Sequence, residues 1–341
     1  MKTRKLGNLT VSGIGMGCMG FSTGYGAIPE ESESIRLIRK AYELECTLYD
    51  TAELYGTYRN EILVGKALAP IREHITLVTK YSPKLLPNQE NYVDGKLSKQ
   101  GVRQAVEDSL KRLNTEVIDL YLCHRVPREI DIRELADWFG ALIRAGKIKG
   151  WGLSEASADE IRAAHEVTPI TAVESEYSMM ARQWEKTVVP LCRKLGIGFL
   201  AYAPMAGGFL SGKISTNTEY KGDDIRRTIT RYQKDNIAAN QPVLDLIKQY
   251  ADEKNVSMAQ ISLAWVMHES HIVPIPGMRN DSRIAENLGA ADVILSDDEY
   301  HNITAALDKL TIYGDRKDED IAKLAQVRIE LYGQSGMAID K

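Results

Sequence analysis

Four side chains suited to acid–base chemistry follow short apolar segments of this sequence. They are Asp50, Tyr55, Lys80 and His124, and the segments that lead to them read TLYDTAELYG, ITLVTK and VIDLYLCH. A free tyrosine has a pKa near ~10, a nearby ammonium lowers that pKa, and an imidazole can hydrogen-bond a substrate oxygen. Any one of these residues alone, at the end of a strand, most often has no catalytic role. Together, at successive strand ends, they predict a site that moves a proton to or from a carbonyl oxygen.

The segments that position these residues alternate between strand-like and helix-like patterns. The clearest helix is GVRQAVEDSLKRLN, which places four apolar residues on one face. Strict alternation of this kind produces a parallel sheet, and eight units in about 300 residues fit a closed (β/α)8 TIM barrel better than an open sheet. We therefore expect one domain over residues 1–341. The predicted strands lie near 14–18, 46–50, 75–79, 118–122, 148–152, 170–174, 197–201 and 271–275.

Three further segments are expected around the barrel. TRKLG and TVSG, separated by a turn at Asn8, predict an N-terminal β-hairpin that closes the bottom of the barrel. Residues 205–240 read as a long loop at the upper rim, where long loops are usually functional. SDDE at 296–299 is a capping box that opens an extra C-terminal helix. The tail at 311–341 is partly amphipathic and has no assigned role.

Composition restricts the class of protein. The 341 residues are 44% hydrophobic and 26% charged, and the net charge of −4 argues against a nucleic-acid or membrane-surface partner. Four cysteines, at 18, 46, 123 and 192, form no CxxC pair and predict buried thiols in a reducing compartment. No signal-peptide core opens the chain, and no apolar run approaches the ~18 residues of a membrane span. These features predict a cytoplasmic protein.

Two motifs of other enzyme classes are relevant, and the sequence supports neither function. Residues 15–20 (GMGCMG) satisfy the GxGxxG pattern of a Rossmann fold, which requires a helix to begin directly there. The chain continues instead as FSTGYGAIPEES, and its helix is expected near Glu31, so we assign the motif to the first strand and its loop. Barrel hydrolases carry an HxH pair on the first strand, which this chain lacks. We therefore predict no metal site.

The sequence resembles the aldo-keto reductases over nearly its whole length. The resemblance implies a reductase of small-molecule aldehydes or ketones that uses NADPH/NADP, extended across the barrel top without a Rossmann fold. Tyr55 would be the general acid, Lys80 paired with Asp50 would depress its pKa, and His124 would orient the carbonyl. The matching stretches are LYDTAELYG (48–56), LVTK (77–80), SLKRLNTEVIDLYLCH (109–124), GKIKGWGLSE (146–155), AYAPMAGGFLSG (201–212) and PIPGMRNDSRIAENLGA (274–290).

The same resemblance implies a set of cofactor contacts. A glycine after a strand, followed by arginines that enter a helix N-terminus, is independently a plausible phosphate site. Residues Cys18 and Met19 would lie close to the cofactor. The implied contacts are Asp50, Ser154, Glu155 and Glu174 near the nicotinamide, Tyr202 stacked on its face, Ala203, Pro204, Met205, Ala206, Gly207 and Lys213 at the pyrophosphate, Gly277, Arg279 and Arg283 at the 2′-phosphate, and Glu286 and Asn287 at the adenine.

Glu155 and Glu174 depart from the amides that the family commonly has at these positions. An ionised carboxylate only accepts hydrogen bonds, whereas an amide also donates them. We expect two carboxylates to favour the cationic oxidised nicotinamide over the neutral reduced form. The alternative function is a cofactor-sensing regulatory subunit of the same fold. A lyase or isomerase on a barrel has no support beyond the fold.

Overall fold

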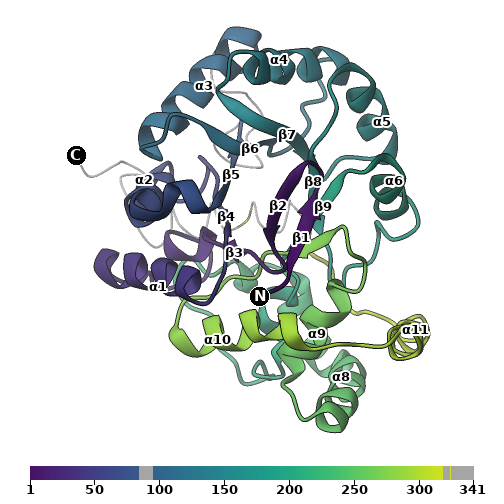
Figure 1. Cartoon of the computed structure of the whole chain (residues 1–341). Coiled ribbons are helices and arrows are strands. Elements are labelled where there is room, and N and C mark those ends of the chain that lie inside the picture. Colours follow the sequence, from purple (N-terminus) through teal and green to yellow (C-terminus); the bar gives the residue numbers. More distant parts are fainter. Residues whose placement is uncertain (84–94, 318–322, 324–341) are drawn as a thin grey trace.

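The computed structural model describes residues 1–83, 95–317 and 323. Eight parallel strands in this part of the chain form one sheet in the order β10-β9-β8-β7-β6-β5-β4-β3. The backbone amides of Gly15 and Gly17 donate to the carbonyls of Pro274 and Pro276, over 2.9 and 3.1 Å, and join the first strand to the last. These bonds close the (β/α)8 barrel, which Figure 1 shows nearly end-on. The predicted fold class is therefore confirmed.

Each of the eight predicted strands overlaps one observed strand. Most of their residues are buried, because helices cover the outside of the barrel and side chains fill its inside. The strands are β3 (Met16–Gly17), β4 (Leu48–Asp50), β5 (Thr76–Tyr81), β6 (Ile118–Cys123), β7 (Ile148–Ser154), β8 (Ala172–Glu176), β9 (Gly198–Tyr202) and β10 (Ile272–Pro274).

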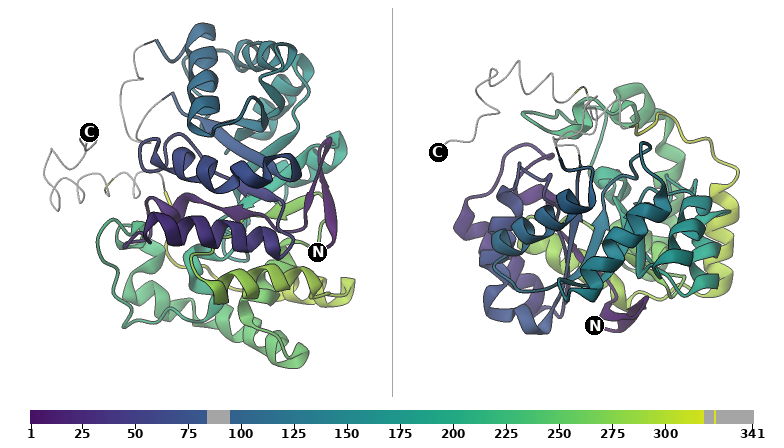
Figure 2. Two further views of the ribbon diagram at one scale, coloured as in Figure 1. Left: turned by 60° about the vertical axis from the view of Figure 1, so that its left-hand side comes forward. Right: turned by 90° about the horizontal axis from the view of Figure 1, so that it is seen from above.

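Helices surround the sheet in the views of Figures 1 and 2. The predicted capping box is present at Ser296 and Glu299 and opens α11, the extra C-terminal helix. Gly146 and Gly196 end two helices with φ of 70° and 69°, a left-handed conformation that favours glycine. The helices are α1 (Glu31–Glu43), α2 (Arg59–Leu68), α3 (Lys99–Arg112), α4 (Ile132–Arg144), α5 (Ala158–Val167), α6 (Val188–Leu195), α7 (Lys234–Ala239), α8 (Gln241–Lys254), α9 (Met258–Val266), α10 (Asp281–Gly289) and α11 (Asp297–Leu307).

The predicted hairpin consists of β1 (Thr3–Leu6) and β2 (Leu9–Ser12), which pair antiparallel. Figure 2 shows it at the lower end of the barrel. Leu6 and Val11 are fully buried and belong to the same apolar cluster as Leu48, Leu120 and Val273, which line the barrel interior. The hairpin therefore plugs the end of the barrel opposite to the carboxyl ends of the strands, and the predicted plug is confirmed.

Residues 205–240 are more structured than the predicted loop. They contain the short 3-10 helices η3 (Ala206–Ser211), η4 (Ile225–Arg227) and η5 (Thr230–Tyr232), followed by α7. Glycine and polar residues suggested an irregular segment. Contacts with other loops, described below, instead order it across the barrel top.

Two sequence predictions concern residues that lie largely outside the described part of the chain. They concern the loop after Lys80, which is long enough in the sequence to extend over the site, and the amphipathic tail after residue 311. Within the described residues, no helix is both long and apolar enough to cross a membrane.

Candidate active site

Lys80 and Asp50 form a buried ion pair at the carboxyl ends of β5 and β4. The Lys80 Nζ lies 2.7 Å from each carboxylate oxygen of Asp50 and 2.9 Å from the carbonyl oxygen of Thr51. Lys80 is fully buried and Asp50 is 2% exposed. Burial alone would lower the pKa of Lys80, but the charges of Asp50, Glu174 and Tyr55 raise it above its ordinary value. The lysine is therefore a fixed cation.

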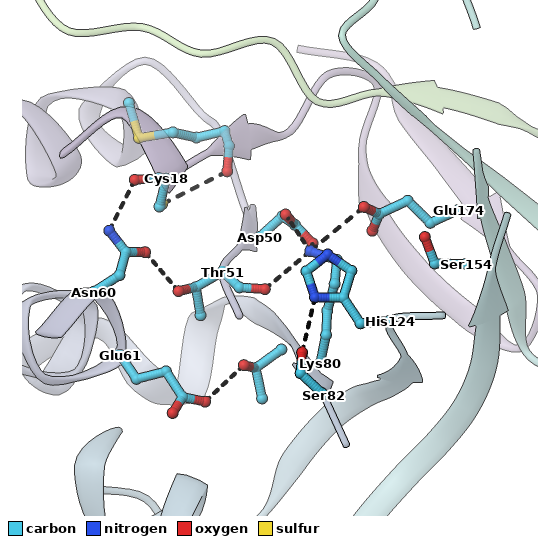
Figure 3. Close-up of polar contacts among 12 residues, drawn as sticks. Cys18, Asp50, Thr51, Asn60, Glu61, Lys80, Ser82, His124, Ser154 and Glu174 are labelled. Carbon is cyan, nitrogen blue, oxygen red and sulfur yellow. Dashed lines mark hydrogen bonds and ion pairs between the residues drawn. The ribbon is translucent and has the colours of Figure 1, made fainter. Parts of the chain in front are cut away.

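Glu174, on β8, faces the same ammonium from the other side. Its Oε1 lies 3.4 Å from the Lys80 Nζ, an ion pair drawn as a dashed line in Figure 3. Its Oε2 is buried, and no described residue hydrogen-bonds it. Burial, followed by the negative charge of Asp50, raises the pKa of Glu174 well above its ordinary range. One cation thus serves two buried carboxyl groups.

Tyr55 lies in the loop after β4, and its ring packs against both Lys80 and His124. The Lys80 Nζ is 5.2 Å from the ring centroid, and the His124 ring meets the Tyr55 ring edge-on, with centroids 5.8 Å apart. Three successive residues with positive φ, Gly56, Thr57 and Tyr58, turn the chain directly after it. Strained backbone of this kind is common at functional sites.

Lys80 lowers the pKa of Tyr55 as expected, but burial outweighs this effect, so the net pKa is raised. Burial, the largest effect, raises the pKa of Tyr55 above its ordinary value, and the charges of Asp50 and Glu174 add to the increase. Lys80 does lower the pKa, in the predicted direction, but by less than burial raises it. The phenol is consequently a neutral proton donor at physiological pH.

His124 follows β6 and hydrogen-bonds a residue that sequence reasoning missed. Its Nδ1 lies 3.0 Å from the hydroxyl oxygen of Ser82. Burial lowers the pKa of His124 well below its ordinary value, and the charges of Arg125 and Lys80 lower it further. The imidazole is therefore neutral, and Ser82 occupies one of its two nitrogens.

Ser82 is itself held by a buried ion pair behind the site. The Glu53 Oε1 accepts from the Ser82 amide over 2.6 Å and from the Lys96 ammonium over 2.7 Å. Lys96 also donates to the Ser82 carbonyl over 3.1 Å. Only the position of Ser82, two residues after Lys80, hinted at this role in the sequence.

The other residues expected near the nicotinamide lie around Glu174. Ser154 is buried and pairs with Glu174 across the β7–β8 register. Glu155 adopts a positive φ of 57°, and its carboxylate accepts from the Glu176 amide over 2.7 Å. Tyr202 ends β9, and Cys18 is buried directly after β3. All four lie at the carboxyl ends of their strands, as predicted.

The stretch from Ala203 to Gly207, expected at the pyrophosphate, contacts an ordered strap. Ala203 and Ala206 have positive φ of 48° and 43°, and the Gly207 carbonyl accepts from the Arg226 guanidinium over 3.1 Å. The strap, residues 219–232, reaches the loop at 19–27, where the Asp223 carboxylate accepts from the Gly24 amide over 3.0 Å. This contact joins two segments far apart in the sequence.

The residues expected at the 2′-phosphate and adenine lie near the start of α10. The Arg279 guanidinium donates to the carbonyls of Tyr25 and Ala27 over 2.9 and 2.8 Å, so it already holds the 19–27 loop. Arg283 lies in the first turn of α10, and its amide is capped by Asn280. In the same region, Lys213 pairs with Glu286 over 3.1 Å, and the Asn287 amide lies 3.5 Å from the Gly277 carbonyl.

A cation that the sequence analysis did not identify, Arg316, lies over Tyr202. Arg316, in the segment after α11, lies 5.1 Å from the Tyr202 ring centroid and 3.1 Å from its hydroxyl oxygen. Arg316 also pairs with Glu176, which in turn binds Arg231 over 3.1 Å. The start of the tail is thus tied to the end of β9.

Comparison with known proteins agrees with this geometry. Residues 13–308 match the aldo/keto reductase family. A curated relative from Glycine max, described as probable aldo-keto reductase 1, is 38% identical over 304 residues, which are 87% of this chain and 86% of the relative. The chain belongs to the aldo/keto reductase family. It is accordingly a member of a family of oxidoreductases that act on carbonyl compounds.

Solved structures of the family have the same fold. The glycerol dehydrogenase AKR11B4 from Gluconobacter oxydans superposes with a TM-score of 0.80 at 25% identity, over 92% of this chain and 97% of that one. An aldo/keto reductase from Klebsiella pneumoniae, solved in complex with NADP and acetate, gives a TM-score of 0.69 at 24% identity, over 89% and 94% of the two chains. At that identity the second comparison supports the fold alone.

Proposed function

We propose that this aldo/keto reductase is an NADPH-dependent enzyme that reduces an aldehyde or ketone to an alcohol. The observation that carries the proposal is the cluster of side chains at the carboxyl ends of β4, β5 and β6, in which Lys80 is buried and Tyr55 and His124 are half-buried. There a neutral phenol, Tyr55, lies between a fixed ammonium, Lys80, and a neutral imidazole, His124. The buried free cysteines support a reducing, cytoplasmic location.

The residues present fit a nicotinamide dinucleotide. The Glu174 Oε2 is a buried polar atom with no hydrogen-bond partner among the described residues, at the place expected for the carboxamide. An aromatic ring, Tyr202, ends β9, left-handed backbone follows it, and Arg283 lies in the first turn of α10. When bound, the reduced nicotinamide supplies a hydride to the carbonyl carbon.

Tyr55 and His124 act on the carbonyl oxygen. In the tautomer that this proposal assigns to His124, the ring proton is on Nε2, where it hydrogen-bonds and orients the carbonyl. The Nδ1 then accepts a hydrogen bond from the Ser82 hydroxyl, 3.0 Å away. Tyr55 then donates its phenolic proton to the oxygen as negative charge develops. Lys80 stabilises the resulting phenolate, and Asp50 keeps the ammonium in place.

Replacement of Tyr55 by Phe tests this assignment. We expect turnover to fall by about 10²–10⁴-fold, because the proton donor is lost. NADPH affinity should change by only a few-fold, since the ring remains. Turnover is measured as NADPH oxidation with nitrobenzaldehydes, aldoses and steroids, and affinity by quenching of tryptophan fluorescence.

Tyr58→Phe is the matched control, because Tyr58 lies three residues on and packs against Arg112 rather than Lys80. It should retain turnover. Unchanged turnover in Tyr55→Phe would refute the role of Tyr55. Tight NADPH binding by the parent protein, with no turnover of any carbonyl, would favour the cofactor-sensing subunit instead.

A further inference from the structure

The two carboxyl groups that face Lys80 receive unequal shares of its hydrogen bonds. An ammonium has three donors, and the Lys80 Nζ directs them at the two oxygens of Asp50 and the carbonyl of Thr51. Glu174 is left with an oxygen at 3.4 Å and a second, buried oxygen that lacks a partner in the described structure. Asp50 is therefore the carboxylate that the lysine neutralises (Figure 3).

Apart from Lys80, no described cation forms an ion pair with Glu174. The Arg125 guanidinium donates to the hydroxyl of Ser154, on the neighbouring strand, over 3.3 Å. Burial raises the pKa values of the Tyr55 phenol and the Cys18 thiol, and it lowers the pKa of His124, so all three are neutral. With both carboxyl groups ionised, the cluster would hold two negative charges against one positive charge, on two side chains that are each only 2% exposed. An uncompensated buried charge is costly, and the group takes up a proton instead.

We propose that Glu174 is a proton switch: it is a neutral carboxylic acid in the free protein and with NADPH, and it ionises when NADP⁺ binds. The inference rests on the proposed function, because it requires the nicotinamide ring to lie beside Glu174. On ionisation, the carboxylic O–H bond breaks, the proton passes to the solvent and the carboxylate faces the cationic ring. No oxidation or reduction is involved.

This inference replaces the expectation that two ionised carboxylates act on the cofactor. Glu155 is engaged with the Glu176 amide, and Glu174 behaves as the amide that is common in the family while its proton is present. A neutral Glu174 also favours proton donation by Tyr55, since an ionised Glu174 raises the pKa of the phenol. The switch therefore links the charge of the cofactor to the acidity of Tyr55.

The sign of the pH dependence follows from linkage. Where Glu174 is protonated in the free protein, NADP⁺ binding releases one proton, so the NADP⁺ dissociation constant falls up to about tenfold for each unit of increase in pH. NADPH binding releases none through this group. The 2′-phosphate titrates in both nucleotides, and its effect cancels in the ratio of their dissociation constants.

The experiment measures both dissociation constants by titration calorimetry across neutral pH, in two buffers of different ionisation enthalpy. In the parent protein, the ratio of the NADP⁺ to the NADPH constant should fall with increasing pH, and NADP⁺ should release about one proton more than NADPH. Glu174→Gln should remove both effects. Glu155→Gln is the matched control and should keep them, because its amide oxygen still accepts from Glu176.

A pH-independent ratio in the parent protein, with equal proton release for both nucleotides, would overturn the inference without any variant. If the pH dependence of the ratio survives in Glu174→Gln and disappears in Glu155→Gln, the group that titrates is Glu155. That result would overturn the inference as well. If the parent protein binds neither nucleotide, the proposed function fails and the inference fails with it. Binding with a constant ratio overturns the inference alone.

Discussion

The two ends of the barrel differ in how many cations pair with their buried carboxyl groups. Near the amino end of β6, Asp119 pairs with Arg72 over 2.8 Å and Lys149 over 2.7 Å, and it accepts from the Leu77 amide over 3.0 Å. At the carboxyl ends, one ammonium, Lys80, faces both Asp50 and Glu174.

The difference indicates that the fully paired carboxylate at the lower end stabilises the fold, whereas the incompletely paired carboxyl groups at the upper end are available for chemistry. At the lower end, each carboxylate oxygen of Asp119 pairs with a cation, so the negative charge is fully compensated. At the upper end, one carboxyl oxygen is left without a partner among the described residues. Barrel enzymes place their active sites at the carboxyl ends of the strands, where such imbalance can be used.

Replacement of Lys80 by Met should give the largest effect and should separate the two ends most clearly. Turnover is expected to fall by about 10²–10⁴-fold, because no cation then stabilises the Tyr55 phenolate. Lys149→Met removes a cation from the lower end, 56% exposed, and should leave turnover unchanged. NADPH oxidation measures the turnover of both variants, and circular dichroism shows whether both are folded. Equal turnover in the two variants would contradict the separation.

Replacement of Asp119 by Asn should reverse this pattern. We expect the free energy of unfolding to fall by about 2 kcal/mol, because a buried carboxylate loses its charge-assisted bonds to Arg72 and Lys149. Turnover of the folded protein should not change. Urea unfolding gives the stability and steady-state kinetics the turnover. A variant that unfolds like the parent but turns over slowly would show that the lower end takes part in the chemistry.

Replacement of Ser82 by Ala should give the smallest effect, and it examines the upper end alone. The His124 ring loses one hydrogen bond, worth about 1 kcal/mol, which corresponds to a decrease in kcat of about fivefold. NADPH affinity should be unaffected. Ser82→Thr retains the hydroxyl and should restore kcat. If Thr fails to rescue the Ala variant, Ser82 acts through packing and does not position the ring.

Much of the fold could be predicted from local patterns. The eight strands, the hairpin around Asn8 and the capping box at Ser296 each depend on neighbouring residues, and all are confirmed. Residues 205–240 could not be read in this way. Their order comes from contacts with distant residues, such as that between Asp223 and Gly24, which no local pattern encodes.

In the candidate site too, some residues could be predicted from local sequence, whereas others depend on contacts with distant residues. Asp50, Tyr55, Lys80 and His124 could be found because each lies at the end of a strand or in the loop after it, and parallel strands end at one edge. Ser82 and Arg316 could not be found, because their partners, His124 and Tyr202, are distant in the sequence. The net pKa of Tyr55 could not be found either, since the lowering by Lys80 can be predicted from the sequence and the depth of burial that outweighs it cannot.

By itself, the sequence determined which residue types stand at the strand ends, and hence an acid–base site on a parallel barrel. Only the tertiary structure decided how the charge is shared there. Asp50 takes the hydrogen bonds of Lys80, and Glu174 keeps an oxygen with no partner in the described residues. The reason is physical: the charge that a carboxyl group carries depends on its burial and on its nearest neighbours in space, which a sequence pattern does not specify.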